Sequence, residues 1–377
     1  MKYLSVATMA MAGLGHLAEA AISSVVSGTP MGFAAAVTGG GDADPVYPTT
    51  IDELKTYLTS ADPQVIVISG TFNFQGSEGS TTEQACNQYS CTPDEGGQAL
   101  LNTLDGCGDY ALYDVLLDTA AMEGINVESN KTLVGKDNAV LYGKGLRFAG
   151  VSNIIVQNIA ITNLNPRYVW GGDALVFADS SLIWIDHVAT SYTGRQHYAF
   201  GQNPDASITV SNSYLNGYTS NSATCDNHTY WAMELVGTDD SITWYKNHIY
   251  YTSGRTPALS GSTLFHAVNN IWEDNSGHLL EGTDNGRGLY EGNYFINTPL
   301  IADSGFVGSL FSSSAADVAS CSSALGRDCV QNAYNNTGSF DFADTDFLSD
   351  FSAFTVVTPD SADSVVSSLL SGAGNTL

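Results

Sequence analysis

The chain has 377 residues, and 39 acidic against 12 basic residues give it a formal net charge of -27 at pH 7. Such a chain repels nucleic acids and other polyanions at long range, so a neutral or esterified polymer is the better candidate partner. Its 38 glycines and 19 tyrosines, with few long helical patterns, favour a mostly β protein with many turns.

The first twenty residues have the features of an export signal. Lys2 precedes a weakly apolar stretch, and Ala18-Glu19-Ala20 has the small-x-small form of a secretory cleavage site. We therefore predict a signal peptide over residues 1–20 and a secreted, extracellular protein. No later segment reaches about eighteen uninterrupted apolar residues, so we expect no membrane span. Because elongated repeat folds escape the usual domain size, we expect one domain over 21–377, and a monomer.

A helix and a strand are predicted near the start of the mature chain. Residues 50–53 (Thr-Ile-Asp-Glu) have the form of a capping box, and apolar residues follow at helical spacing as far as Leu58. Residues 65–68 (Val-Ile-Val-Ile) are typical of a buried strand, which we expect Gly70 to stop. We expect the helix to cover the open end of a strand stack, whose edge otherwise invites aggregation.

A loose internal repeat follows, in which each unit is a short apolar strand, a polar corner and a second short strand. The corners fall at Asn158, His187, Asn212, Asn247, Asn269 and Asn293. A period near 20 to 30 residues without intervening helices is typical of stacked β coils, since each coil can bury its apolar side only against its neighbours. The sequence therefore predicts an all-β fold of stacked coils with loops inserted on one side.

We interpret the asparagine corners as scaffold. Asparagine tolerates left-handed backbone angles, and stacked amides satisfy one another. His187 lies at the same kind of corner, and an acid–base role for Asp186-His187 is the alternative. Near the end of the chain, residues 365–370 predict a short amphipathic helix that packs back on the stack.

The six cysteines form an even set in an exported chain, which favours three disulfides over a metal cluster. Their spacing does not choose among the fifteen possible pairings. Sequons at Asn130, Asn227 and Asn335 agree with export and predict glycosylation.

Three turn-like segments hold unusual residues: 169–174 (Val-Trp-Gly-Gly-Asp-Ala), 193–198 (Thr-Gly-Arg-Gln-His-Tyr) and 251–257 (Tyr-Thr-Ser-Gly-Arg-Thr-Pro). Arginine is rare in this chain, so Arg195 and Arg255 beside glycines are candidate site residues. Surface ion pairs are the alternative interpretation.

At these segments the sequence resembles fungal pectin lyases, members of the polysaccharide lyase family that also holds the pectate lyases. The likeness runs from about residue 27 to the C terminus and is weakest between 75 and 125. Its ordered motifs are Asn165-PRYVWGGDA, Trp184-IDHVAT, Gly194-RQHY, Tyr218-TSNSATCDNHTYWA, Tyr251-TSGRTP, His266-AVNNIW and Leu325-GRDC. The resemblance implies a single-stranded right-handed parallel β-helix whose loops form a cleft. It also implies endo-acting β-elimination in methyl-esterified homogalacturonan (pectin), with no cofactor.

The resemblance also implies roles for individual residues. Arg255 matches the family's proton abstractor, and Arg195 and Asp173 match residues beside it. A cation next to the ester carbonyl stabilises the developing enolate, which suits Arg195. A guanidinium is normally protonated, so the role of Arg255 as base rests on the resemblance. Trp170 and Trp231 match aromatic residues that stack on sugars, with a core position as the alternative.

Other tryptophans and the cysteines are assigned as follows. Trp184, Trp244 and Trp272 lie in predicted strands, and we assign them to the core. The resemblance pairs Cys86 with Cys107, Cys91 with Cys225, and Cys321 with Cys329.

Calcium independence is a further prediction. Pectate lyases hold calcium with acidic side chains, but no acidic residue lies between Asp186 and Asp205, where Arg195 stands instead. We therefore expect no metal site.

The chain also departs from the family in two places. Ala258 replaces a lysine, and the segment between Cys86 and Cys107 has Tyr89 but no tryptophan. The open alternatives are a lyase for another uronan such as pectate, a non-catalytic pectin-binding β-helix, and a β-helical glycoside hydrolase, which would need a pair of acidic side chains.

Overall fold

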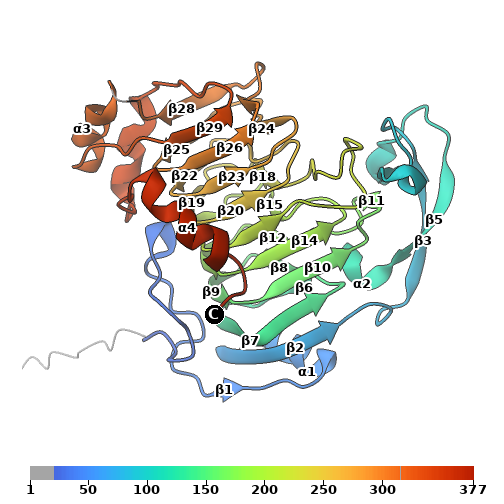
Figure 1. Ribbon diagram of the computed structural model, residues 1–377. Coiled ribbons are helices and arrows are strands. Elements are labelled where there is room, and N and C mark those ends of the chain that lie inside the picture. The colour runs from blue at the N-terminus through green and yellow to red at the C-terminus, as the bar shows by residue number, and fades with distance from the viewer. Residues whose placement is uncertain (1–20, 315) are drawn as a thin grey trace, which may run out of the picture.

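The computed structural model describes residues 21–314 and 316–377, so the predicted signal peptide lies outside the described residues. The chain winds as a stack of coils that rises from the N-terminal to the C-terminal end, with parallel strands of successive coils side by side (Figure 1). Three ladders of parallel strands run along this stack. The predicted parallel β-helix is confirmed.

The first two ladders account for the internal repeat. Each repeat unit supplies its first strand to the first ladder and its second strand to the second ladder. The first ladder consists of β7 (Lys131–Tyr142), β9 (Ser152–Gln157), β13 (Ser181–Asp186), β16 (Ala206–Ser211), β19 (Ser241–Tyr245), β22 (Leu264–Val268), β25 (Gly286–Glu291) and β28 (Gly308–Ser312). The second ladder consists of β10 (Ala160–Leu164), β14 (Ala189–Thr193), β17 (Tyr214–Asn216), β20 (His248–Tyr250), β23 (Ile271–Glu273), β26 (Tyr294–Thr298) and β29 (Ala333–Thr337). Both strands of each predicted repeat unit are therefore confirmed.

The third ladder lies outside the repeat units and has shorter strands. It consists of β6 (Ile125–Asn126), β8 (Leu146–Ala149), β12 (Leu175–Ala178), β15 (Tyr198–Phe200), β18 (Met233–Leu235) and β21 (Ala258–Leu259). Beyond it, a bridge joins Ala258 to Glu281, and β24 (His278–Leu280) pairs with β27 (Leu300–Ala302).

The core consists of apolar side chains that stack along the coils. Ile154, Ile183 and Ile208 pair in register and are fully buried, and each such side chain contributes about 1.5–3 kcal/mol by leaving water. Trp244 and Trp272 lie in this main cluster, whereas Trp184 is buried with Ala34 and Val37 under the N-terminal segment. The prediction that these three tryptophans are buried is confirmed.

The corners between the first and second ladders form two adjacent rows. In the first row the backbone is left-handed, with φ between 48° and 59° at Asn158, His187, Asn212, Lys246 and Asn269. In the second row, one residue further on, amides form a buried ladder: Nδ2 of Asn247 donates to Asn270 (3.1 Å), Asn270 to Asn293 (3.0 Å), and Asn293 to Asn332 (3.0 Å).

The predicted scaffold role of the corners is thus confirmed, but the alignment was wrong by one residue. It placed Asn247 and Asn293 in one row with Asn158, His187, Asn212 and Asn269, whereas both belong to the second row, where Asn270 lies between them. Left-handed geometry and amide stacking belong to neighbouring positions, and both positions favour asparagine.

The N-terminal helix α1 (Ile51–Leu58) lies at the first end of the stack, where Leu54 and Leu58 are buried (Figure 1). Oγ1 of Thr50 accepts from the backbone N–H of Glu53 at 3.2 Å. The second hydrogen bond of the predicted capping box differs from the expected one. The Glu53 carboxylate accepts from the backbone N–H of Thr49 at 2.8 Å rather than from that of Thr50.

The first long strand passes the glycine that was expected to end it. β2 (Gln64–Asn73), which pairs with β1 (Pro45–Val46) and β7, continues through Gly70. The register with β7 shifts between Ser69 and Thr71, and Gly70 has φ of 69°. The predicted stop was wrong because the strand continues past a bulge, in which Gly70 faces residues 137–139 of β7.

The C-terminal helix α4 (Ala362–Gly372) packs Val365 and Leu369 against Ile271, on the outside of the second ladder (Figure 1). Leu377 exchanges two hydrogen bonds of 3.0 Å with the Asn158 side chain. The predicted packing of the tail on the stack is confirmed. In the part of the chain that the structure describes, no helix is long and apolar enough to cross a membrane.

An insertion over residues 80–118, which we call the arm, stands beside the stack (Figure 1). Its strand β3 (Ser80–Cys86) pairs antiparallel with β4 (Ala99–Leu101) and with β5 (Tyr113–Asp118). On its other side β4 pairs in parallel with β11 (Tyr168–Val169). The remaining short elements are α2 (Thr119–Met122), α3 (Ser322–Leu325) and the 3-10 helices Gly32–Ala34, Pro93–Glu95, Thr103–Asp105, Val318–Cys321 and Asp346–Ala353.

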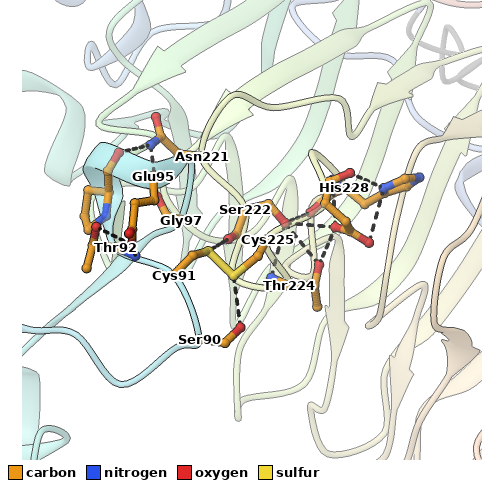
Figure 2. The surroundings of a disulfide bond; sticks show 12 residues. Ser90, Cys91, Thr92, Glu95, Gly97, Asn221, Ser222, Thr224, Cys225 and His228 are labelled. Carbon is orange, nitrogen blue, oxygen red and sulfur yellow. Dashed lines mark hydrogen bonds and ion pairs between the residues drawn. A yellow bond between two sulfur atoms is a disulfide. The ribbon is translucent and has the colours of Figure 1, made fainter.

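The three disulfides are Cys86–Cys107 within the arm, Cys91–Cys225 and Cys321–Cys329, so the pairing implied by the resemblance is confirmed. Cys91–Cys225 joins the arm to the loop before β18 (Figure 2). At this junction Nδ2 of Asn221 donates to the carbonyls of Pro93 (3.2 Å) and Gly97 (2.9 Å) (Figure 2). The arm is therefore fastened to the stack close to the third ladder.

Candidate active site

The candidate residues lie in the turns that lead from the second ladder to the third. Asp173, Arg195, Trp231 and Arg255 each belong to a different coil, just before β12, β15, β18 or β21. Because the coils are stacked with parallel strands, equivalent turns lie beside one another. Residues about 20 to 40 positions apart in the sequence therefore gather at one face of the stack.

Arg195 is held in a tightly packed turn. A Cβ on Gly194 would lie 2.7 Å from the Tyr168 carbonyl oxygen and 2.8 Å from the Gly172 nitrogen, so only glycine fits there. Nη2 of Arg195 donates to Oε1 of Glu234 at 2.8 Å, and the arginine is only 8% exposed. Its Cζ lies 3.8 Å from the centre of the Trp170 ring, which is a close cation–π contact.

Arg255 approaches the same carboxylate from the turn before β21, two coils after the turn of Arg195. Its Nη1 donates to Oε1 of Glu234 at 3.1 Å, and its Nε donates to Oε1 of Glu281 at 3.0 Å. Its Cζ lies 4.9 Å from the centre of the Trp231 ring. We call Arg195 and Arg255 the arginine pair.

Glu234, which the sequence analysis missed, holds the arginine pair together. One carboxylate oxygen accepts from both guanidinium groups, and each guanidinium has five N–H donors, so donors remain for a ligand. Glu234 lies between buried Met233 and Leu235 on β18, and this alternation directs it outward. That pattern was visible in the sequence, but a three-residue strand is too short to be recognised.

Glu281 is a second carboxylate that the sequence analysis missed. Besides Arg255, it accepts from the Tyr230 hydroxyl (2.6 Å) and from His278 Nε2 (2.8 Å). Burial by itself raises the pKa of Glu281, but the hydrogen bonds from His278 and Tyr230 and the charge of Arg255 lower it below its ordinary value. Glu281 therefore stays ionised beside Arg255.

Asp173 is close to Arg195 but is not bonded to its guanidinium. Its Oδ1 accepts from the backbone N–H of Gln196 at 2.7 Å. Burial is the largest effect on this carboxyl and raises its pKa to about 6, although the charge of Arg195 acts in the opposite direction. Asp173 thus supports the turn that carries Arg195 and changes charge in mildly acid solution.

Trp170 and Trp231 lie at the site rather than in the core. Trp170 is 40% exposed, and half-buried Trp231 packs near Tyr89, Leu100 and Val169. Nε1 of Trp231 donates to Oε1 of Gln98, a residue of the arm. Both arginine–aromatic pairs therefore face the same surface.

A pocket of about 300 Å³ opens beside Arg255. It is lined by Glu234, Ala258, Glu281 and Asp303 among others, so the position where the family has lysine is an alanine in an acidic surrounding. A larger hollow of about 570 Å³ at the first coils, lined by Tyr47, Phe72 and Lys136 among others, contains none of the candidate residues.

Asp186 and His187 lie elsewhere, at the corner between the first and second ladders. His187 Nδ1 and Asp186 Oδ2 are 2.8 Å apart. Asp186 is 2% exposed and also accepts from Gln157, Ser211 and Asn212. The pair belongs to the corner row, so it does not contribute to the candidate site.

The three sequon asparagines differ in accessibility. Asn227 and Asn335 are exposed, whereas Asn130 is half-buried and its Oδ1 accepts from Asn153 Nδ2 at 2.8 Å.

Solved structures with the same fold are known pectate lyases and a related allergen. A pectate lyase from Bacillus sp. N165, solved with trigalacturonate, has a TM-score of 0.56 and 19% identity, over 92% of this chain and 98% of that one. The major allergen of cedar pollen has a TM-score of 0.57 and 16% identity, over 92% of each chain. These likenesses establish the class of fold, the parallel β-helix of pectate lyases.

Sequence relatives define the family more narrowly. The family model described as pectate lyase matches residues 95–376. The probable pectin lyase E of Aspergillus niger is 67% identical over 363 residues, which are 96% of this chain and 98% of the relative. Pectin lyase A of Emericella nidulans is 48% identical over 97% of this chain and 99% of its own. The chain belongs to the polysaccharide lyase family of pectate and pectin lyases.

Proposed function

We propose that this protein is a secreted, endo-acting pectin lyase that cleaves methyl-esterified homogalacturonan by calcium-independent β-elimination. The observation that carries the proposal is the arginine pair, which meets at Glu234 between two aromatic rings on the outer face of the third ladder. Family membership and the 67% identical relative named as a pectin lyase support it.

The proposed reaction breaks a glycosidic bond without consuming water. A base takes the C5 proton of a galacturonate methyl ester, and negative charge develops on the ester carbonyl oxygen. The electron pair then forms the C4–C5 double bond while the C4 oxygen leaves with its bond electrons and gains a proton. Arg195 donates to the developing oxyanion, where fixed donors stabilise the transition state most.

Arg255 takes the role of base in this proposal, as its motif position implies. Its guanidinium is partly exposed and shares the Glu234 carboxylate with Arg195. Glu234 and Glu281 fix its Nη1 and Nε, which leaves Nη2 available to the substrate. Asp173 positions the Arg195 turn through Gln196.

The charge around the arginine pair supports an esterified substrate. Glu234, Glu281 and Asp303 surround the pocket beside Arg255, so a free carboxylate there would meet like charges. Trp170 and Trp231 offer flat faces for sugar rings. Arg195 supplies the positive charge that calcium supplies in a pectate lyase, which supports calcium independence.

Export, domain organisation and oligomeric state are part of the same proposal. We take residues 1–20 as a signal peptide, residues 21–377 as one lyase domain, and the protein as a monomer that binds neither nucleic acid nor membranes. The exposure of Asn227 and Asn335 supports glycosylation there better than at Asn130.

The test follows the ultraviolet absorbance of unsaturated uronide. Purified protein is incubated with highly methylated pectin or with polygalacturonate, each with a chelator, alongside Arg255→Ala and the matched control Arg167→Ala, whose arginine pairs with exposed Asp94. We expect absorbance to rise on pectin only, to vanish with Arg255→Ala and to persist with Arg167→Ala. A preference for polygalacturonate would indicate the pectate alternative, and binding without cleavage would indicate the non-catalytic one. New reducing ends without absorbance would indicate a hydrolase.

A further inference from the structure

The outer face of the third ladder carries a single row of side chains that leads away from the arginine pair. Arg147 pairs in register with Val176, Val176 with Ala199, Ala199 with Glu234, and Glu234 with Ala258. Residues in register on neighbouring parallel strands point to the same face. Since Glu234 belongs to this row and bonds to both arginines, the row forms the protein surface next to the arginine pair.

Arg147 stands near the N-terminal end of this row, with Asn126 of β6 in register beyond it. Its neighbours Leu146 and Phe148 are fully buried, whereas Arg147 is partly exposed, so its side chain lies on the outer face. Three strand spacings separate it from Glu234, which is about 14 Å. Between them lie only Val176 and Ala199, whose side chains are small and apolar. No large side chain of this row therefore stands between Arg147 and the arginine pair.

Arg147 differs from the other arginines in its partners. Arg167, Arg195, Arg255, Arg287 and Arg327 each pair with a carboxylate. Among the described residues, no carboxylate lies within 4.0 Å of the Arg147 guanidinium, whose partner is the amide oxygen of Asn126 at 2.9 Å. In a chain with 39 acidic residues, an arginine without a carboxylate is unexpected. Most of its five donors remain free for an anion.

We propose that Arg147 forms a distal subsite for a galacturonate residue whose carboxylate is free. This subsite rests on the proposed function, because it needs the polymer to run along the coils from the arginine pair. A guanidinium suits a carboxylate because its planar donors match both oxygens. A methyl ester at the same position would offer no charge to it.

The subsite and the acidic pocket select opposite states of the polymer. Beyond Arg255, Glu281 and Asp303 disfavour a free carboxylate, whereas Arg147 favours one on the other side of Glu234. A pectin chain with an ester at the reacting residue and a free carboxylate a few residues away fits both. The inferred substrate is thus partly de-esterified pectin rather than the fully esterified polymer.

The experiment compares kcat/KM on highly methylated pectin with kcat/KM on the same pectin after random partial removal of its esters. The measured quantity is the ratio of the second to the first for wild type, Arg147→Gln, Arg147→Lys and the control Arg167→Gln. We expect Arg147→Gln to lower the ratio roughly threefold to tenfold, because one charge-assisted hydrogen bond is lost. Arg147→Lys should keep most of the ratio, and Arg167→Gln all of it.

Salt provides a second readout. The wild-type ratio should fall relative to the Arg147→Gln ratio as salt rises, since screening weakens the ion pair of Arg147, while relief of the general repulsion between acidic protein and anionic pectin is common to both. An unchanged ratio in Arg147→Gln, with a wild-type thermal midpoint, would overturn the subsite. Failure of the proposed function is distinct, since the wild type would then cleave neither pectin. Weaker binding of partly de-esterified pectin to Arg147→Gln would still support the subsite in that case, and equal binding would overturn it.

Discussion

The indole Nε1 of Trp231 donates a hydrogen bond of 3.0 Å to Oε1 of Gln98. The amide nitrogen of the same glutamine donates to the carbonyls of Pro166 (2.9 Å) and Gly194 (3.0 Å). Gln98 is 3% exposed. One buried side chain of the arm thus touches the three segments that carry Trp170, Arg195 and Trp231.

Gln98→Ala should lower kcat/KM on methylated pectin by roughly tenfold or more, since small displacements of positioned groups cost large factors in rate. The substitution leaves one buried donor and two carbonyls without their partner. Steady-state kinetics and tryptophan fluorescence check this. Gln84→Ala, an exposed glutamine of the same arm, is the control. Wild-type kinetics in Gln98→Ala would show that Gln98 does not position the site.

Ala258→Lys should raise kcat/KM on methylated pectin roughly threefold to tenfold, mainly through a lower KM. The new ammonium would enter the acidic pocket beside Arg255 and could donate to the ester carbonyl. Ala258→Met supplies similar length without charge. If the lysine variant is no better than the methionine variant, the missing cation is not what limits this enzyme.

Stability should fall as the pH rises from about 4 to about 7, because of two buried carboxyls in neighbouring coils. Asp240 accepts from the backbone N–H of Asp205 at 2.8 Å. Burial raises the pKa of Asp205 to about 6 and, with the nearby charge of Asp205, that of Asp240 to about 7. Both pKa values lie above the ordinary value, so the folded chain holds protons that the unfolded chain releases. The stabilisation is present at lower pH and is lost as these groups ionise.

Asp205→Asn should flatten this dependence. Oδ1 of Asp205 accepts from Ser180, whereas Oδ2 has no partner in the part of the chain that the structure describes, so an amide can replace the carboxyl. Thermal midpoints between about pH 4 and pH 8 test the sign, with the fall expected below about pH 7 and little change above it. The exposed Asp363→Asn variant should follow the wild type. An equal slope in Asp205→Asn would contradict the assignment.

Asn270→Ala should lower the free energy of unfolding by about 2–4 kcal/mol, because its removal leaves neighbouring buried amide groups unpaired. Asn270 is fully buried, accepts from Asn247 and donates to Asn293 and the Trp244 carbonyl. Chemical denaturation measures the loss. The control variant Asn203→Ala removes an exposed amide at a residue without left-handed backbone, and it should change little. Equal effects of the two substitutions would argue against the ladder.

Some corrections to the sequence interpretation have a common cause. The repeat was recognised from strand–corner–strand units, but the corner rows were misaligned at Asn247 and Asn293, since both adjacent positions favour asparagine. The side-chain bonds between Asn247, Asn270 and Asn293 separate the two rows, and these bonds connect different coils. Local sequence cannot distinguish such neighbours.

The sequence by itself determined the stacked-coil fold, the capping helix, the tail helix and the segments that carry Arg195 and Arg255. These features depend on apolar periodicity, caps and glycine turns, which act over a few residues. The tertiary structure alone decided that Glu234 joins the arginine pair, that Gln98 reaches three segments, and that Arg147 has no carboxylate partner among the described residues. Each depends on which side chains from distant coils face one another, and that is set by register across the ladders rather than by order along the chain.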